Sequence, residues 1–249
     1  MHDSLRHFER DTIHRGFHLD DLTFRMLYAE SEQYLLPLSH DEVVHGKGSL
    51  LAKMPGDDWQ QFANLRLLFG YQHAMTGKKL LFMGGEMAAR EEWDHESSLP
   101  WHVLDAESHA GMLRWVAQCN ELHRTVPALH ERDCGGGGFE WVDCTDHERA
   151  VLSWLRYGHD RDDPVLVVAN LTPVPRDAYV VGAPFGGTWT VLADSDDRRF
   201  WGSGHRGDPA PDGPGWPDLV ARDEGAHGRP HSLALRLPPL SILFLRRAQ

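Results

Sequence analysis

Tyr34-Leu35-Leu36-Pro37-Leu38-Ser39-His40-Asp41-Glu42-Val43-Val44-His45-Gly46-Lys47 brings a dense group of titratable side chains directly after a short apolar run. The run is too short for a stable helix and is typical of a buried parallel β-strand. In a (β/α) barrel, the carboxyl ends of the strands form the floor of the active site. The stretch therefore predicts a strand over 34–38 and a candidate site at its end.

Size and charge exclude several classes of function. The 249 residues can form one large domain or two of ordinary size. With 25 basic and 37 acidic residues, the net charge of −12 argues against binding to nucleic acid or to an anionic membrane. The chain has no long apolar run, and the polar residues 1–10 lack the apolar core of a signal peptide. We expect a cytoplasmic protein.

The cysteine pattern fits that compartment. Cys119, Cys134 and Cys144 are odd in number and form no Cys-x-x-Cys pair. We therefore expect free thiols in a reducing cytosol rather than a disulfide or a zinc site.

A helix and a second strand follow the first strand. Asp57 is expected to cap the helix, with Gln60 completing a near relative of the capping box, and Gly77 to end it. One apolar face of this helix is predicted from Trp59, Phe62, Leu65, Leu68 and Phe69. The run at 80–83 reads as the second strand, so that a βαβ unit is predicted. A further helix is expected near 109–122, with Ser108 as its cap and with one apolar face formed by Met112, Trp115, Val116, Cys119 and Leu122.

The sequence pattern changes at Gly135–Gly138, from helices and loops before this run to short strands after it. We interpret the run as a linker. Short strand patterns follow, separated by turn residues, and predict an antiparallel β-sandwich. The predicted strands are 139–144, 150–157, 165–170, 178–181, 188–193, 232–237 and 241–246. The segment 202–217, rich in glycine and proline, is expected to be a mobile surface loop.

His40, Asp41 and Glu42 are the first candidate site residues. If the strand pattern continues, Asp41 and Glu42 point to opposite faces, and only one of them faces a barrel mouth. A carboxylate there could stabilise a positive transition state, and His40 could donate a hydrogen bond to a sugar or phosphate oxygen. A solvated loop after a strand is the alternative interpretation. The five-residue spacing of His40 and His45 does not fit a zincin motif, and no metal site is expected.

Glu86 and Trp93 are weaker candidates for substrate binding. Glu86 follows Gly84 and Gly85 at the end of the second strand, although a tight turn with a surface glutamate would look the same. Trp93 could stack against a sugar ring, although most tryptophans simply pack in the protein. Trp141, Trp154 and Trp189 are expected in the core.

Several segments taken together closely resemble the bacterial glycogen (1,4-α-glucan) branching enzymes, which belong to the α-amylase superfamily. The segments in the first half are Leu36–Lys47, Lys53–Asp57, Ala63–Arg66, Gly77–Glu86 and Glu92–His95. Those in the second half are Ala169–Arg176 and His227–Leu233. The likeness covers nearly the whole chain and is weakest at about 202–218.

The resemblance implies an α/β plus all-β architecture. Residues 1–133 would be the carboxyl-terminal part of a (β/α)8 TIM barrel, with 34–38 as strand seven and 80–83 as strand eight. Residues 134–249 would be the all-β domain that follows the barrel.

The resemblance also implies roles. Asp41 matches the third catalytic carboxylate, a transition-state stabiliser that binds hydroxyls of the ring under attack, and His40 matches the histidine that hydrogen-bonds to that ring. The reaction is retaining transglycosylation of α-glucan, in which a 6-hydroxyl accepts the transferred segment and makes an α-1,6 branch in glycogen. It needs no metal or organic cofactor.

One departure from the family pattern matters. The family's nucleophile Asp and acid/base Glu lie on strands four and five, whereas Met1-His2-Asp3 resembles the segment just after strand six. We therefore expect this chain alone to be inactive, with the amino-terminal part of the same enzyme as a possible partner. Two alternatives stay open. One is a non-catalytic glucan-binding or interaction module; the other is a related trehalose-releasing maltooligosyl hydrolase, which the motifs of the strand region fit less well.

Overall fold

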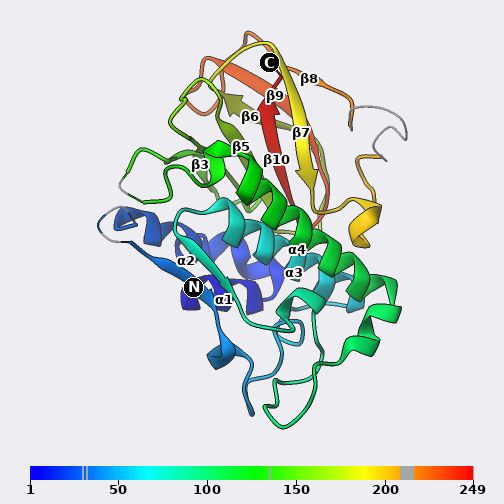
Figure 1. Cartoon of the computed structure of the whole chain (residues 1–249). Helices are drawn as coiled ribbons and strands as arrows, with labels where there is room; N and C mark the ends of the chain where they lie inside the picture. The colour runs from blue at the N-terminus through cyan, green and yellow to red at the C-terminus, as the bar shows by residue number, and fades with distance from the viewer. Residues whose placement is uncertain (30, 32, 135, 208–215, 249) are drawn as a thin grey trace.

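The computed structural model describes residues 1–29, 31, 33–134, 136–207 and 216–248. Within these ranges a helical region lies against a β region (Figure 1). None of the helices in the described ranges combines the length and apolarity needed to cross a bilayer. In chain order the helical region contains α1 (His2–Glu9), the 3-10 segment η1 (Thr12–His18), α2 (Asp20–Thr23), η2 (Phe24–Leu27), β1 (Leu35–Leu38), η3 (His40–Glu42), α3 (Asp58–Ala74), β2 (Lys78–Leu81), η4 (Gly85–Met87), η5 (Trp101–Asp105), α4 (Glu107–Thr125) and η6 (Pro127–Leu129).

The predicted βαβ unit is present. β1 and β2 pair in parallel, from Leu35 opposite Lys78 to Leu38 opposite Leu81, and α3 connects them. β2 begins two residues earlier than predicted and ends before Phe82, whose N–H still donates to the Leu38 carbonyl at 2.9 Å. The two strands therefore end at the same edge, as a shared site requires.

α3 starts as the sequence predicts but is buried differently. The Asp57 carboxylate accepts from the Gln60 N–H at 2.9 Å, and the Gln60 side chain accepts from the Asp57 N–H at 3.0 Å, which confirms the capping box. The prediction of a single apolar face is wrong, because every residue from Phe62 to Ala74 is buried. α1, α4 and two strands of the β region all contact this helix, so it has no solvent face beyond its first turn.

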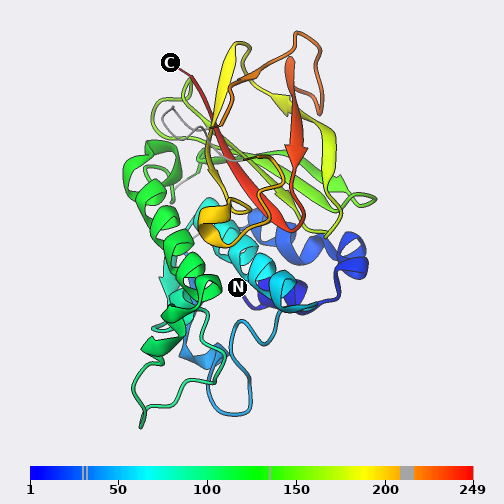
Figure 2. The ribbon, with the colours of Figure 1, turned by 90° about the vertical axis from the view of Figure 1, so that its right-hand side faces the viewer.

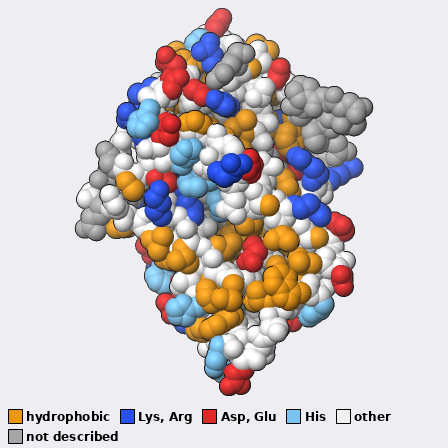
Figure 3. Space-filling view, in the orientation of Figure 1, with side chains coloured by type: hydrophobic (Ala, Val, Ile, Leu, Met, Phe, Trp, Pro, Cys, Tyr) orange, Lys and Arg blue, Asp and Glu red, His pale blue; other side chains and the backbone are white. Residues whose placement is uncertain are grey.

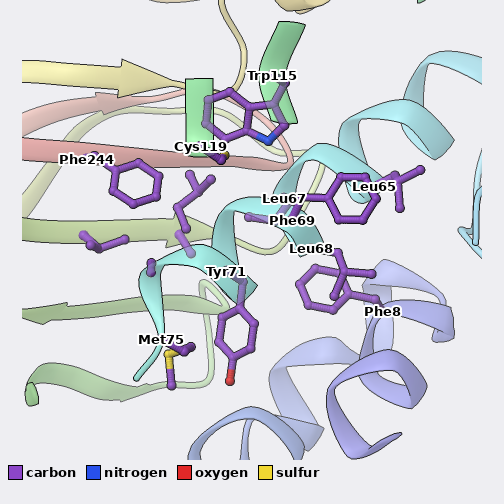
Figure 4. Packing of buried hydrophobic residues seen from close by; sticks show 14 of the residues in the cluster. Phe8, Leu65, Leu67, Leu68, Phe69, Tyr71, Met75, Trp115, Cys119 and Phe244 are labelled. Carbon is purple, nitrogen blue, oxygen red and sulfur yellow. The ribbon is translucent and has the colours of Figure 1, made fainter. Parts of the chain in front are cut away.

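α4 covers α3 and carries the face that was predicted. Met112, Trp115, Cys119 and Leu122 are buried. Trp115 packs against α3 and lies near Phe244 of the β region (Figure 4), with 6.5 Å between the two ring centroids, and its indole N–H donates to the Arg66 carbonyl at 2.8 Å. The prediction that Ser108 caps this helix is wrong, because the helix begins at Glu107 and its N-cap is Ala106.

The β region is an antiparallel sandwich, as predicted (Figure 2). Its elements are β3 (Phe139–Asp146), β4 (Val151–Arg156), β5 (Val165–Asn170), β6 (Arg176–Ala183), β7 (Thr188–Asp194), the 3-10 turn η7 (Arg198–Phe200), β8 (Leu219–Val220), β9 (His231–Leu237) and β10 (Ser241–Arg247). All seven predicted strands are present, and the two-residue β8 was not predicted. Of the expected linker and loop, residues 135 and 208–215 lie outside the described residues.

The two faces of the larger sheet have different partners. That sheet has the order β3-β4-β5-β10-β7-β8, and β6 pairs with β9 in a second sheet. Trp154 and Phe244 on one face belong to the core of the helical region, whereas Trp189 and Leu243 on the other face pack against the second sheet. Trp154 and Trp189 are fully buried as predicted, but Trp141 is only half-buried.

A buried ionic cluster joins the helical region to the larger sheet. The Asp133 carboxylate lies 2.8 Å from Arg156 Nη2 on β4 and 3.1 Å from Lys79 Nζ on β2. The Arg156 guanidinium also donates to the carbonyls of Ala74 and Gly138, at 2.8 and 3.0 Å. Burial lowers the pKa of Lys79 to about 8.

Replacing Asp133 with Asn should destabilise the fold strongly. It leaves the guanidinium of Arg156 buried without its counter-charge, which typically costs roughly 3–5 kcal/mol. Urea unfolding followed by circular dichroism measures the change, and Glu121→Gln, in an exposed pair with Arg124, serves as the control with about 0–1 kcal/mol expected. A loss for Asp133→Asn no larger than that of the control would contradict this prediction.

The amino-terminal helix α1 was not predicted from the sequence. It buries Leu5, His7 and Phe8. His7 Nδ1 lies 3.0 Å from the His18 carbonyl oxygen and is therefore the protonated nitrogen, while Nε2 is buried without a hydrogen-bond partner. Burial lowers the pKa of His7 to about 3.

His7 should make the protein sensitive to acid. Its folded pKa of about 3 lies below its ordinary 6.5, so the unfolded chain binds the proton first, and stability is lost as the pH falls from 6.5 towards 3. The expected loss from this group is about 1.4 kcal/mol per pH unit. Urea unfolding at pH 7.5 and pH 5.0 should show a smaller pH dependence for His7→Asn, whose amide can still donate to His18. The same substitution at the exposed His14 should change nothing, and an equal pH dependence in both variants would disprove the assignment.

Candidate functional site

His40, Asp41 and Glu42 form a 3-10 turn directly after β1. The Ser39 hydroxyl oxygen accepts from the Asp41 N–H at 3.3 Å and caps this turn. The strand pattern therefore stops at Leu38, and the condition under which Asp41 and Glu42 would alternate across a strand is not met. The site residues are displayed by a turn at the strand's carboxyl end.

The three side chains of the turn divide into an exposed pair and an inward carboxylate. His40 Nε2 lies 3.4 Å from Asp41 Oδ1, and both side chains are more than half exposed. Glu42 is largely buried, with Oε1 3.1 Å from Nδ1 of His2 on α1. Asp41 and His40 can therefore meet a ligand directly, whereas Glu42 points towards α1.

An aromatic cluster connects this turn to the loop after β2. The Phe82 ring lies 5.7 Å from the His40 ring and 5.1 Å from the Trp93 ring, and His40 and Trp93 are 6.4 Å apart. The backbone N–H of Trp93 donates to the Val43 carbonyl at 2.8 Å. The structure thus brings together His40, Asp41 and Trp93, which the sequence singled out separately. Phe82, which fixes their arrangement, was read only as a strand residue.

Glu86 lies in a tight turn, η4, after β2. Gly84 and Ala88 flank this turn with φ values of +88° and +54°, both in the left-handed region. Glu86 is half-buried and does not line the cavity beside Trp93. Its place among the site residues stays a prediction.

A cavity of about 330 Å³ opens beside Trp93. Its apolar wall includes Val43, Leu50, Met83, Trp93, Leu99 and Pro100, and its polar side chains include Glu91, Glu92, Asp94, Ser97 and His102. Hydrophobic side chains gather over the half of the molecule that holds these loops (Figure 3). A largely apolar pocket with a few polar groups is the usual form of a small-molecule site.

Glu92 stabilises the segment 43–48, which follows the turn that carries His40 and Asp41. It was not among the site residues predicted from the sequence. Its Oε1 accepts from the Gly48 N–H at 2.7 Å, and its Oε2 lies 3.4 Å from His45 Nδ1. Hydrogen bonds from the Gly48 and Gly46 backbones lower the pKa of Glu92. Lys47 Nζ donates a hydrogen bond to the Asp41 carbonyl at 2.6 Å. Hydrogen bonds therefore hold both ends of the segment 43–48.

No metal centre is evident near these residues. In the described part of the chain, no group of three or more His, Cys, Asp or Glu side chains is arranged to hold a metal ion. Asp41 and His40 offer hydrogen bonding and charge at the turn, with the aromatic rings of Phe82 and Trp93 beside them.

The β region matches a known family. Residues 141–248 match the family described as the alpha amylase C-terminal all-beta domain. The chain is also similar over 99% of its length to the crystal structure of an alpha-amylase from H. orenii, with a TM-score of 0.53 and 13% identity, covering 46% of that chain. At this identity the likeness concerns the fold alone.

Curated relatives match along the whole chain. The chain is 54% identical over 248 residues to the 1,4-alpha-glucan branching enzyme GlgB of Cereibacter sphaeroides, covering 100% of this chain and 33% of that protein. It is 52% identical to the enzyme of the same name from Aquifex aeolicus, covering 99% of this chain and 38% of that protein. The chain thus spans about a third of the length of the relatives it matches.

Replacing Glu92 with Ala should loosen the loop that carries the site. The Gly46 and Gly48 amides lose their acceptor and should exchange hydrogen with solvent faster, by about tenfold for one lost hydrogen bond of this kind. Amide exchange followed by NMR measures this, with Glu91→Ala at the exposed neighbouring position as the control. Unchanged protection of both amides in Glu92→Ala would refute the role given to this carboxylate.

Proposed function

Because the chain is a relative of the bacterial 1,4-alpha-glucan branching enzymes of the α-amylase superfamily and resembles their carboxyl-terminal region, we propose that it holds an α-glucan ring next to the bond being exchanged. The observation that carries this proposal is the convergence of Asp41, His40 and Trp93 at the carboxyl end of β1.

The proposal includes an architecture. β1 and β2 act as the seventh and eighth strands of a (β/α)8 barrel formed by residues 1–133 with further chain, and residues 134–249 form the all-β domain after it. The parallel pairing of β1 with β2 through α3, and the likeness to an alpha-amylase fold, support this arrangement. Both candidate loops leave the same edge of the two strands, where barrel sites collect their ligands.

Asp41 stabilises the positive charge that develops on the sugar ring, and His40 donates a hydrogen bond to the same ring. The exposure of both side chains and the capping of their turn by Ser39 support these roles. Trp93 offers an aromatic surface to the glucan, and Glu42 and Glu86 contribute more weakly. Glu42 reaches substrate only if it leaves His2.

The exchange of glucan segments needs two further carboxylates. A retaining enzyme uses a nucleophile and an acid/base about 5–5.5 Å apart. The resemblance assigns neither role to any of residues 1–249, so we propose that this chain alone does not make branches. The amino-terminal part of the same enzyme would be the partner that supplies both groups, and no cofactor is needed.

A second candidate function is a non-catalytic glucan-binding or interaction module. The observation in its favour is the second hydrophobic core, which lies wholly within the β region between its two sheets. In that case glucan binding would not depend on Asp41 or Trp93.

Incubating the chain with amylose should leave the iodine colour unchanged, because on this proposal the chain supplies neither the nucleophile nor the acid/base carboxylate. Loss of colour together with new α-1,6 linkages in the NMR spectrum would disprove the inactivity.

Affinity electrophoresis in gels containing glycogen tests binding: Trp93→Ala and Asp41→Asn should each reduce the retardation by at least half. Trp101→Ala, which removes another exposed indole, should not. Full retardation of all three variants would instead favour the module.

A further inference from the structure

One wall of the cavity beside Trp93 is formed by the η4 turn and its flanks. Gly84, Gly85, Ala88 and Ala89 all line the cavity. Ala88 has a φ value of +54°, in the left-handed region that residues other than glycine seldom adopt. Its N–H donates to the Gly85 carbonyl at 3.0 Å. A residue in this conformation persists only when the surrounding structure holds it there, so the hold on this turn bears on the shape of the cavity.

His109 on α4 supplies such a hold. Its side chain is buried, and Nδ1 lies 2.8 Å from the Met87 carbonyl oxygen. Because a carbonyl oxygen only accepts, Nδ1 carries the proton and donates. Met87 is fully buried and directly precedes Ala88. The hydrogen bond therefore fixes the peptide group that leads into the left-handed residue.

The ring of His109 is supported by aromatic side chains that extend into the β region. Phe62 on α3 packs edge-to-face against it, with 5.0 Å between the ring centroids and 89° between the planes. Trp201, directly after η7, packs against the same Phe62 ring, with 5.1 Å between the centroids. Ring contacts thus run from the β region through α3 and α4 to the wall of the cavity. No described residue of the β region lines the cavity itself.

The position of Trp201 is set by a close backbone approach to α4. Gly111 lies two residues after His109, and a Cβ atom on Gly111 would come within 2.7 Å of the Phe200 carbonyl carbon. Trp201 itself has a φ value of +62°, which is unusual for a bulky residue, and its N–H donates to the Arg198 carbonyl at 3.0 Å. α4 therefore contacts η7 with one part of its surface and η4 with another.

We propose that His109 is a positioning residue for the cavity beside Trp93, and that the β region sets the shape of this cavity through Trp201 and Phe62. The effect on the turn follows from these contacts alone. The effect on a bound glucan rests on the proposed function. The β region then takes part in the site without touching the ligand there.

Amide hydrogen exchange followed by NMR, on the full chain without ligand, tests the role of His109. His109→Phe keeps a ring against Phe62 but leaves the Met87 carbonyl without its donor. Exchange at Ala88 and Ala89 should become about tenfold faster relative to the β5 amides, which report unfolding of the whole molecule. His109→Asn, whose amide nitrogen can replace Nδ1, should restore most of the protection. Equal acceleration at the turn and in β5 in His109→Phe would overturn the inference, because a general loss of stability has that effect.

Trp201 provides the remote test. Trp201→Ala removes the ring that supports Phe62 and should speed exchange of the turn amides by about threefold relative to β5, whereas Trp201→Phe should not. Trp141→Ala is the matched control, since this half-buried indole of β3 packs against other rings of the β region. An unchanged ratio in Trp201→Ala, or an equal rise in Trp141→Ala, would disprove the link through the β region.

Isothermal titration with maltoheptaose extends the test to binding. His109→Phe and Trp201→Ala should weaken the Trp93-dependent part of the binding by about three- to tenfold, because a loosened turn must be ordered again when the ligand binds. His109→Asn and Trp141→Ala should bind as the unaltered chain does. Full affinity in His109→Phe despite faster exchange at the turn would show that the turn does not shape the binding cavity. If the unaltered chain gives no heat, the proposed function fails, and the exchange rates still decide the positioning role.

Discussion

The buried carboxylate of Asp133 has charged partners on two different strands. Lys79 comes from β2 and Arg156 from β4. A buried carboxylate is tolerated only when its counter-charges are held in good geometry. The position of β2 is therefore fixed against the larger sheet of the β region. Since β1 pairs with β2 and Phe82 follows β2, the same constraint extends to the turn that carries His40 and Asp41.

Local signals predicted local structure well. The Asp57 and Gln60 pair gave the start of α3 because both partners of a capping box lie within four residues. The seven strands followed from short apolar runs between turn residues. The burial of α3 on all sides could not be predicted, because its polar residues are buried with distant partners: Arg66 donates to the Ser195 carbonyl, and Gln72 donates to the Leu36 carbonyl. A periodicity argument assumes that polar side chains meet water, which is not true of this helix.

The site was predicted in its parts but not in its assembly. His40, Asp41 and Trp93 were chosen for their chemistry and their places after strands. The ring contacts between two loops some fifty residues apart leave no pattern in the sequence, so Phe82 and Glu92 were missed. Residue type indicated which groups could react, and only the fold indicated which of them meet.

The larger sheet has no water-facing side along its central strands. On one face, the core shared with the helices contains Trp154, Val167 and Phe244. On the other face, the core shared with β6 and β9 contains Val168 and Leu243. Separating the helical region from the β region would expose a large apolar surface on each of them, and such a surface promotes aggregation. Melting of one piece would remove the support of the other, so heat should dismantle the molecule as one cooperative unit. A β region working as a detached module would need a new cover for that surface.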